Sequence, residues 1–334
     1  MSGGPLNRVL YRSRDLLFLP WLDGLWRRRL HGQVVCLLYH RVAERRQDEP
    51  LAGCGVPPIS PAELHQELSF LQRQGGQFLS FRELREGCWP DPDRFGVIVS
   101  FDDGFACNYD AGLEVLESLG LRGIIFQSTA MLCGEPLIWE HILYWIWRQP
   151  DLLAALRQRL EALPNWSELR SLGPAALLAA LRDRTPWQQL EPLLATMWPL
   201  LGGEDRLREL AAPLYPSERQ LQQAVARGHE IGSHGHQHLP RHNLSAAHFE
   251  QDLIQSRRVL SRILSAPPAA YSYPFNSHQP GDAEICGHHF SQVATVDGGT
   301  IKPDTSPLAL PRITWPGPHR NRLRRRRWLW TGRF

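Results

Sequence analysis

The sequence of 334 residues has few of the features that place a protein quickly in a class or compartment. Its six cysteines form no CxxC pair and follow no regular spacing, which disfavours a disulfide framework and favours reduced thiols in the cytoplasm. No apolar run approaches the roughly 20 residues that cross a bilayer. The longest one near the N-terminus, LLFLPWL at 16–22, is short, contains a proline and is flanked by charge, so we expect no secretory signal peptide.

Charge is nearly balanced over the whole chain but not along it. The formal net charge is +3, yet residues 8–29 hold six arginines and residues 320–327 hold six more. Two basic, tryptophan-bearing ends favour attraction to an anionic surface, with a solvated basic tail as the alternative. Residues 11–30 are suited to a membrane interface, which predicts a cytoplasmic protein that is peripheral on the inner membrane face. Nucleic-acid binding would rest on these arginines alone, and we do not expect it.

Strand-like and helix-like segments alternate from residue 33 onward. The clearest helix is 60–76, which opens with a Ser cap, a proline and a Glu three residues after the cap. Strands are predicted at 33–40, 77–81, 96–101, 122–128, 229–234, 269–275 and 291–296, and further helices at 111–120, 218–227 and 245–264. This alternation, with 43% hydrophobic residues to form a core, predicts an α/β fold with a parallel sheet or barrel.

The alternation is interrupted between about residues 140 and 217. This stretch is rich in Leu, Ala, Trp and Pro and predicts several short helices with no strand, as an insertion or lid. We therefore divide the chain into three parts. A basic amphipathic segment (1–32) precedes one large domain (33–316), which carries the helical insertion, and a basic Arg/Trp tail (317–334) follows it.

Two adjacent aspartates follow a buried strand in GVIVSFDDGF at 96–105. Residues at the carboxyl ends of parallel strands line the functional face of such folds, so Asp102 and Asp103 are candidate functional carboxylates. Gly104 allows the chain to turn there. Taken alone, DDG is also an ordinary turn.

Histidines gather at the end of another predicted strand, in GHEIGSHGHQH at 228–238. His234 and His238 are four residues apart, a spacing that lets two imidazoles face one metal ion if the chain enters a helical turn. A carboxylate and two histidines form a common open ligand set for a hydrolytic zinc ion, with a position left for water. One aspartate would then bind the metal and the other would act as a base, and the cation would relieve their mutual repulsion.

The segments SFDDGF, EIGSHGHQH and YSYPF occur in the order of three motifs that they resemble, those of the polysaccharide deacetylase family. This family is also called the NodB-homology domain or carbohydrate esterase family 4. The resemblance covers about residues 33–130 and 218–315. LLYHRV (38–43) and LPRI (310–313) resemble segments of one bacterial branch that has an N-terminal Tyr-His segment. The resemblance implies a distorted (β/α) barrel, in agreement with the alternation of strands and helices.

The resemblance also implies a role for each matched residue. Asp102 would be the general base, and Asp103 would bind one divalent metal ion together with His234 and His238. The ion is usually zinc in the family, although cobalt and other divalent ions are accepted.

The third motif differs from the usual family pattern. Tyr273, Pro274 and Phe275 would wall the substrate groove, and the backbone N–H of Phe275 would help to hold the oxyanion. The family usually has an arginine two residues before this proline, paired with the catalytic aspartate, where this chain has Ser272. We infer that Arg312 of LPRITW replaces it.

The family's late Leu-x-His motif, which supplies a general acid, is missing as well. His40, at the end of the strand 33–40, is the best substitute, because a histidine from this early strand is thought to take that role in the bacterial branch. The alternative is that Tyr39 and His40 merely close the barrel. His229 and His236, within the second motif, are expected to be structural rather than metal ligands.

The resemblance thus implies a metal-dependent hydrolase that removes N-acyl groups, with N-acetyl as the first expectation, from an amino sugar in a glycan or glycan precursor. We expect a nucleotide-linked or polyprenyl-linked sugar of surface-glycan assembly as the substrate. A deformylase of a lipid-linked amino sugar is one alternative. A non-catalytic glycan-binding or scaffold protein of the same fold is another, which the intact set of Asp102, Asp103, His234 and His238 argues against.

Overall fold

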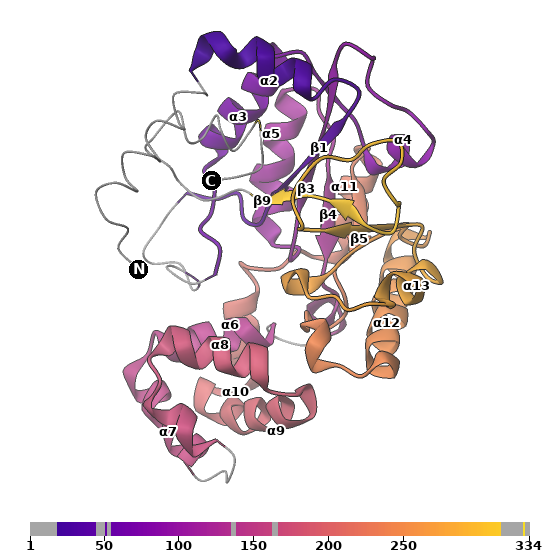
Figure 1. Ribbon diagram of the computed structural model, residues 1–334. Helices are drawn as coiled ribbons and strands as arrows, with labels where there is room; N and C mark the ends of the chain where they lie inside the picture. The colour runs from indigo at the N-terminus through magenta and orange to yellow at the C-terminus, as the bar shows by residue number, and fades with distance from the viewer. Residues whose placement is uncertain are drawn as a thin grey trace, which may run out of the picture.

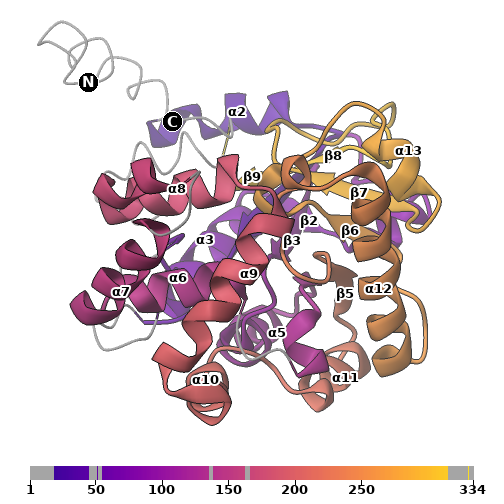
Figure 2. The ribbon, with the colours of Figure 1, turned by 90° about the horizontal axis from the view of Figure 1, so that it is seen from below.

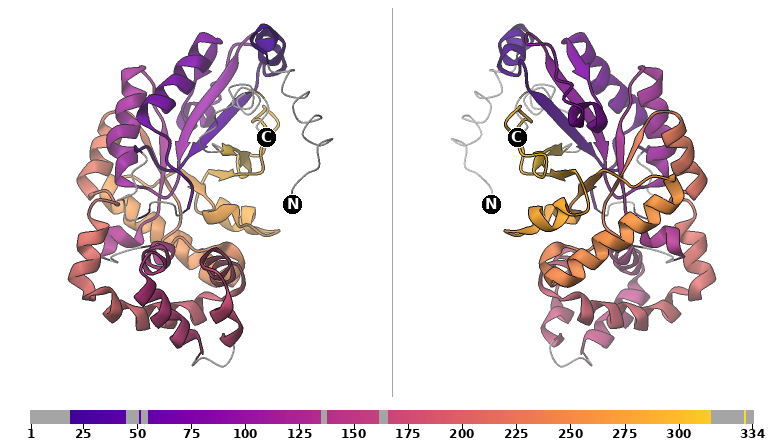
Figure 3. Two further views of the ribbon diagram at one scale, coloured as in Figure 1. Left: turned by 90° about the vertical axis from the view of Figure 1, so that its left-hand side faces the viewer. Right: turned by 90° about the vertical axis from the view of Figure 1, so that its right-hand side faces the viewer.

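Parallel strands form a nearly closed barrel at the centre of the protein (Figure 1, Figure 3). The computed structural model describes residues 19–44, 51, 55–134, 138–161, 166–314 and 330. The strands are β1 (Val34–Tyr39), β2 (Gly76–Phe78), β3 (Phe95–Phe101), β4 (Ile124–Gln127), β5 (Glu230–Ser233), β6 (Ala270–Ser272), β7 (Gln292–Thr295), β8 (Leu310–Pro311) and β9 (Ile313–Thr314). Their order is β8-β7-β6-β5-β4-β3-β1-β9, and β2 also pairs with β3. The predicted (β/α) barrel is confirmed.

A single residue separates the two ends of this sheet. β8 pairs with β7 and β9 pairs with β1, and only Arg312 lies between β8 and β9. The segment 310–314 therefore connects the last strands to the first and closes the barrel. This position buries the Arg312 side chain completely.

The strands are apolar because both of their faces are covered. β1 and β3 are buried along their whole length, as expected for parallel strands between a barrel interior and a layer of helices. Close packing also fixes Gly232 of β5, because a Cβ there would lie 2.5 Å from the ring of Phe126 on the adjacent strand β4. Glycine at this position lets the two strands approach to pairing distance.

Helices alternate with the strands around the barrel. They are α2 (Asp23–Arg29), α3 (Pro61–Arg73), α4 (Phe81–Arg85), α5 (Leu113–Ser118), α11 (Glu218–Ala226), α12 (Ala246–Leu264) and α13 (Asp282–Gly287). The capping box expected at the start of α3 is present, with Ser60 and Glu63 each accepting a hydrogen bond from the other's backbone N–H.

Two predicted elements are present with different boundaries. The predicted strand 77–81 ends with β2 at Phe78, because Ser80 and Glu83 form a second capping box that begins α4. The predicted helix 111–120 begins earlier, with a π-helical turn at Asn108–Gly112 that runs directly into α5.

Five α-helices occupy the region that was predicted as a helical insertion. They are α6 (Trp139–Trp147), α7 (Pro150–Glu161), α8 (Pro174–Arg184), α9 (Trp187–Met197) and α10 (Gly203–Ala211). They lie together below the barrel in Figure 1 and face the viewer in Figure 2. The apolar cluster that they form includes Tyr271 of β6 and Tyr273 directly after this strand, so the insertion packs onto the barrel through one continuous core.

The basic ends of the chain lie largely outside the described residues, namely all of 1–18 and, apart from Trp330, all of 315–334. Within the described part, the Trp330 indole N–H donates to the Asp23 carboxylate at 3.1 Å. Among the helices that the structure describes, none has the length and apolar character needed to cross a membrane.

Candidate active site

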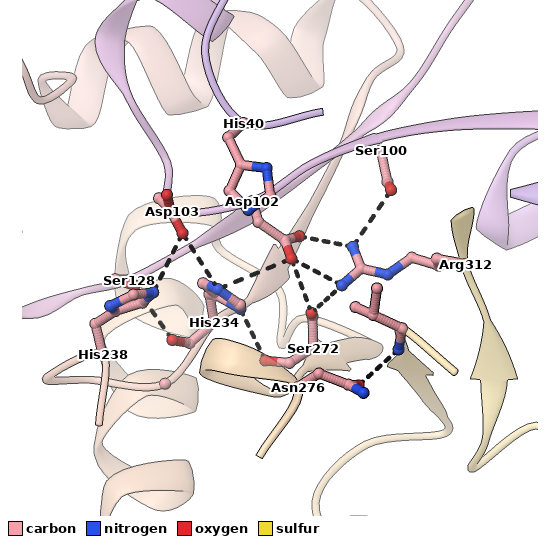
Figure 4. Close-up of polar contacts among 12 residues, drawn as sticks. His40, Ser100, Asp102, Asp103, Ser128, His234, His238, Ser272, Asn276 and Arg312 are labelled. Atoms are coloured by element: carbon pink, nitrogen blue, oxygen red, sulfur yellow. Dashed lines mark hydrogen bonds and ion pairs between the residues drawn. The ribbon is translucent and has the colours of Figure 1, made fainter. Parts of the chain in front are cut away.

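The two adjacent aspartates lie at the carboxyl end of β3 (Figure 4). Asp103 has a φ of 69° and Gly104 a φ of 77°, so the chain turns sharply and directs the two carboxylates to different partners. A Cβ at position 104 would lie 2.3 Å from the carboxamide of Gln127, which restricts the position to glycine. DDG is therefore a turn, as the alternative interpretation held, and this turn separates the two carboxylates.

His234 and His238 come from the loop that follows β5. This loop is irregular and does not form the helical turn that was the condition for two histidines at this spacing to face one ion. Instead, the Asp252 carboxylate on α12 accepts hydrogen bonds from the backbone N–H groups of His236 and Gln237, at 2.8 and 3.1 Å. These two bonds hold the loop between the two imidazoles.

Asp103, His234 and His238 gather their side chains around one point (Figure 4). Asp103 Oδ1 lies 3.5 Å from His234 Nε2 and 3.2 Å from His238 Nε2. One potential ligand atom from each residue lies within 4.8 Å of the other two, and all three residues are buried. Two imidazoles and one carboxylate suit a divalent ion such as zinc and leave positions for water and substrate.

The surroundings of these side chains fit a bound cation. Burial alone would raise the pKa of Asp103, but the imidazoles of His234 and His238 beside it hold this pKa well below its ordinary value. The two ring nitrogens of His238 are buried without a well-oriented hydrogen bond to any described residue. A buried imidazole in that state requires a partner such as a metal ion.

Asp102 pairs with Arg312, and its Oδ2 also lies 3.9 Å from His234 Nε2 at the edge of the cluster. The guanidinium donates to both Asp102 carboxylate oxygens, at 2.6 and 2.7 Å, and also to the Ser272 hydroxyl (Figure 4). Ser272 in turn donates to Asp102 at 3.3 Å. Burial alone would raise the pKa of Asp102, but the charge of Arg312 lowers it below its ordinary value. Asp102 is therefore an ionised, oriented carboxylate.

His40 directly follows β1 and lies beside the two aspartates (Figure 4). Asn108, which the sequence did not single out, donates to the His40 carbonyl at 2.6 Å and so fixes the backbone. His40 Nδ1 is buried without a hydrogen-bond partner among the described residues, and burial lowers the pKa of this imidazole. A neutral ring thus faces the candidate site.

The third motif lies on the same side of the barrel. Tyr273 and Phe275 line the pocket, whereas Pro274 is buried between them and does not line it. Phe275 has a φ of 57°, and its ring lies 4.7 Å from that of His238. The strained backbone at Phe275 brings the aromatic wall against the histidine cluster.

One pocket of about 470 Å³ is lined by both aspartates, His40, His234, His238, Tyr273 and Phe275. The barrel also contributes Arg41 and Phe105, which the sequence analysis did not identify. The insertion contributes another part of the wall that the sequence analysis did not identify, through Glu140, His141, Tyr144 and Arg182.

Glu140 is the insertion's closest charge to the histidine cluster. Burial raises the pKa of this carboxyl to about 7, against an opposing effect from His238. The segment IWEHILYW offered little signal in the sequence, because a Glu-His pair inside an apolar helical run does not show which way its side chains face.

Two further histidines of the second motif bind elsewhere. His229 Nε2 lies 3.0 Å from Glu117, and His236 Nδ1 lies 2.8 Å from the Thr129 hydroxyl. Neither belongs to the cluster around Asp103.

Comparison with known proteins points to one family. Residues 196–283, which include the histidine loop and the third motif, match the family model for polysaccharide deacetylase. No curated protein matches the chain.

Three solved structures have a similar fold. They are the Streptococcus pyogenes deacetylase PplD (14% identity, 85% of this chain and 93% of that one, TM-score 0.55), IcaB from Ammonifex degensii (19%, 85% and 92%, 0.53) and a de-N-acetylase from Aggregatibacter actinomycetemcomitans (14%, 84% and 94%, 0.50). At these identities the likeness is one of fold.

Proposed function

We propose that this protein, whose residues 196–283 match the polysaccharide deacetylase family model, is a metal-dependent hydrolase of that family that removes N-acetyl groups from an amino sugar in a glycan or glycan precursor. One observation carries the proposal. A three-residue metal cluster and a separate carboxylate paired with arginine share one pocket. Hydrolysis of an amide needs both a place for a cation and a base that stays ionised beside it.

Each residue has a task in this proposal. Asp103, His234 and His238 would hold a divalent ion, with zinc as the first candidate, and the bound ion would supply Lewis acidity to the amide carbonyl and to water. Asp102 takes the proton from the attacking water, and Arg312 keeps this carboxylate ionised and oriented.

The other pocket residues act on the substrate. Tyr273 and Phe275 wall the site against the sugar, and the backbone N–H of Phe275 stabilises the oxyanion. His40 protonates the leaving amine. The ring of His40 is neutral, so it must receive a proton first, and the proton that Asp102 takes from the water is the source of it.

The deciding experiment combines metal analysis with product detection. Purified protein is loaded with Zn²⁺ or Co²⁺ and offered N-acetylated oligosaccharides and lipid-linked amino sugars, and released acetate and formate are measured separately. Acetate release that depends on the metal supports the proposal. Formate release instead would favour a deformylase, and stoichiometric metal without release from any substrate would favour a non-catalytic glycan-binding protein.

We further propose that the protein binds an anionic membrane surface through α2 and the flanking arginines. Trp21 and Leu25 are 76% and 63% exposed, more than any other large hydrophobic side chain in the described residues. Arg27, Arg28 and Arg29 are exposed at the end of the same helix. Exposed aromatic and aliphatic side chains next to cations suit an interface of anionic headgroups.

The C-terminal tail is basic in sequence, with six arginines at 320–327. Trp330 of this tail donates its indole N–H to the Asp23 carboxylate of α2. The contact of Trp330 with α2 and the arginines near both ends of the sequence support a peripheral location on the cytoplasmic face of a membrane during cell-surface glycan assembly.

Sedimentation with vesicles of phosphatidylcholine and phosphatidylglycerol tests this surface. Binding should fall with added salt, and exchanging both Trp21 and Leu25 for Ser should weaken it at least tenfold. Ile254→Ser, which changes an exposed apolar residue of α12, is the matched control. Equal binding of both variants, or tighter binding to duplex DNA than to vesicles, would contradict the membrane proposal.

A further inference from the structure

The start of the insertion lies directly against the metal-cluster residue His238. The Trp139 indole N–H donates to the His238 backbone carbonyl at 3.0 Å, and Glu140 Oε1 lies 3.8 Å from His238 Nδ1. Both contacts come from the first two residues of α6. They approach His238 at a backbone φ of 55°, a conformation that a histidine holds only when its surroundings fix it.

The two histidines of the cluster differ in what their Nδ1 atoms, which lie away from Asp103, contact. His234 Nδ1 lies 2.8 Å from the Ser272 carbonyl, which fixes that ring as a donor there and leaves Nε2 free as a ligand. His238 presents Nε2 to Asp103 in the same way. Its Nδ1, however, is buried and makes no hydrogen bond within the described residues, and Glu140 is the carboxylate beside it.

Glu140 is well placed to act on His238 and poorly placed to act as a ligand itself. Its side chain is 9% exposed, and it approaches the Nδ1 side of the ring, whereas Asp103 faces Nε2. The cluster of potential ligands in the described chain contains Asp103 and both histidines but not Glu140. The other basic group at close range is His141, whose Nε2 lies 3.7 Å away while its Nδ1 contacts the Tyr215 hydroxyl.

We propose that Glu140 is a positioning residue for His238, and that the helical insertion is thereby a structural part of the metal site. The carboxylate accepts a hydrogen bond from His238 Nδ1–H once the 3.8 Å separation closes, which fixes the tautomer with Nε2 available to the ion. Trp139 holds the His238 backbone from the same helix. This inference rests on the proposed metal site, because it assigns a partner to one of its ligands.

The direct test measures metal affinity rather than turnover. Zn²⁺ affinity is determined by competition with a chromophoric chelator, and Co²⁺ absorption reports the coordination geometry of the site. Glu140→Ala should weaken Zn²⁺ binding about 10- to 100-fold and alter the Co²⁺ spectrum. Glu140→Gln should recover part of the affinity, because its amide oxygen can still accept from Nδ1–H.

Two controls make the result specific to His238. Glu191→Gln changes an exposed glutamate of α9 in the same insertion and should leave the affinity unchanged. Far-UV circular dichroism and the melting temperature of the metal-free protein show whether the Glu140 variants keep the fold. If Glu140→Ala does not fold, the Zn²⁺ affinity of Glu140→Gln is compared with that of the unaltered protein. Trp139→Phe then removes the other contact between α6 and His238, the hydrogen bond from the indole to the backbone carbonyl.

The outcomes separate this inference from the proposed function. If the unaltered protein binds no divalent ion, the proposed metal site itself is wrong. If it binds Zn²⁺ and the Glu140 variants bind equally tightly, the positioning role is wrong while the metal site stands. A raised KM with unchanged metal affinity would likewise overturn the inference and make Glu140 a substrate contact.

Discussion

Arg312 and Asp102 form a bidentate ion pair in the barrel interior although 210 residues separate them in the sequence. The pair exists because the segment 310–314 bridges β7 and β1 and leaves Arg312 between its two short strands. Ser272 stands where the family usually has an arginine, and its hydroxyl bonds both members of the pair. The guanidinium thus reaches the aspartate from a different strand.

Removing Arg312 should destabilise the protein strongly. Arg312→Met leaves the Asp102 charge buried without its partner, so we expect the free energy of unfolding to fall by about 3–5 kcal/mol in urea denaturation. Adding Asp102→Asn removes that charge and should restore part of the loss. Asp102→Asn alone gives the cost of the second substitution. If the double variant is less stable than Arg312→Met by that same free energy, the two residues are not coupled.

The two aspartates should fail in different ways when replaced. Asp102→Asn should lower kcat at least about 100-fold while bound metal stays near stoichiometric, because Asp102 pairs with Arg312 and does not belong to the described cluster of potential ligands. Asp103→Ala and His238→Ala should lose the metal itself. Elemental analysis of each purified variant beside an acetate-release assay checks this. Loss of metal in Asp102→Asn would reverse the assignment of the two carboxylates.

How far the sequence predicts this site depends on where its residues lie along the chain. Asp102, Asp103 and His234 directly follow apolar strands, and the rule that strand ends share one rim of a barrel brings them together. The sequence did not establish the backbone of the histidine loop, because Asp252 on the helix α12, rather than local helical bonding, holds it.

The insertion shows what sequence patterns leave out. Glu140 lies in a helix that is apolar on nearly all sides. The periodicity of its sequence therefore does not predict which way the Glu140 side chain points or which residue it contacts. Only the packing of α6 against His238 reveals where the carboxylate points. The pairing of Arg312 with Asp102 could be predicted only by asking which arginine replaces the one that the third motif lacks. The segment LPRITW itself contains nothing that identifies Asp102 as the partner of Arg312.

His40 offers a test of a side-chain role against a structural one. Asn108 anchors the His40 backbone, so His40→Gln should keep the fold and the bound metal. If the imidazole protonates the leaving amine, kcat should fall by about 100- to 10,000-fold with little change in melting temperature. A parallel loss of melting temperature and activity would instead show that Tyr39 and His40 serve to close the barrel.

His141 should make the stability of the protein depend on pH below neutrality. Burial lowers the pKa of this imidazole from its ordinary 6.5 to about 3, so the folded protein keeps it neutral while the unfolded chain binds a proton as the pH falls below about 6.5. The stabilisation is complete above that pH and is lost progressively toward pH 3, at a rate of about 1.4 kcal/mol per pH unit from this group.

Urea denaturation of the metal-free protein between pH 7 and pH 4.5 measures this dependence. His141→Phe keeps an aromatic ring in the stack with Phe105 and Tyr215 but cannot titrate, so its free energy of unfolding should fall less steeply as the pH decreases. His65→Gln, which replaces an exposed histidine of α3, should keep the slope of the unaltered protein. Identical slopes for all three proteins would mean that His141 is free to take up a proton in the folded state, and that the insertion opens at this contact when the pH falls.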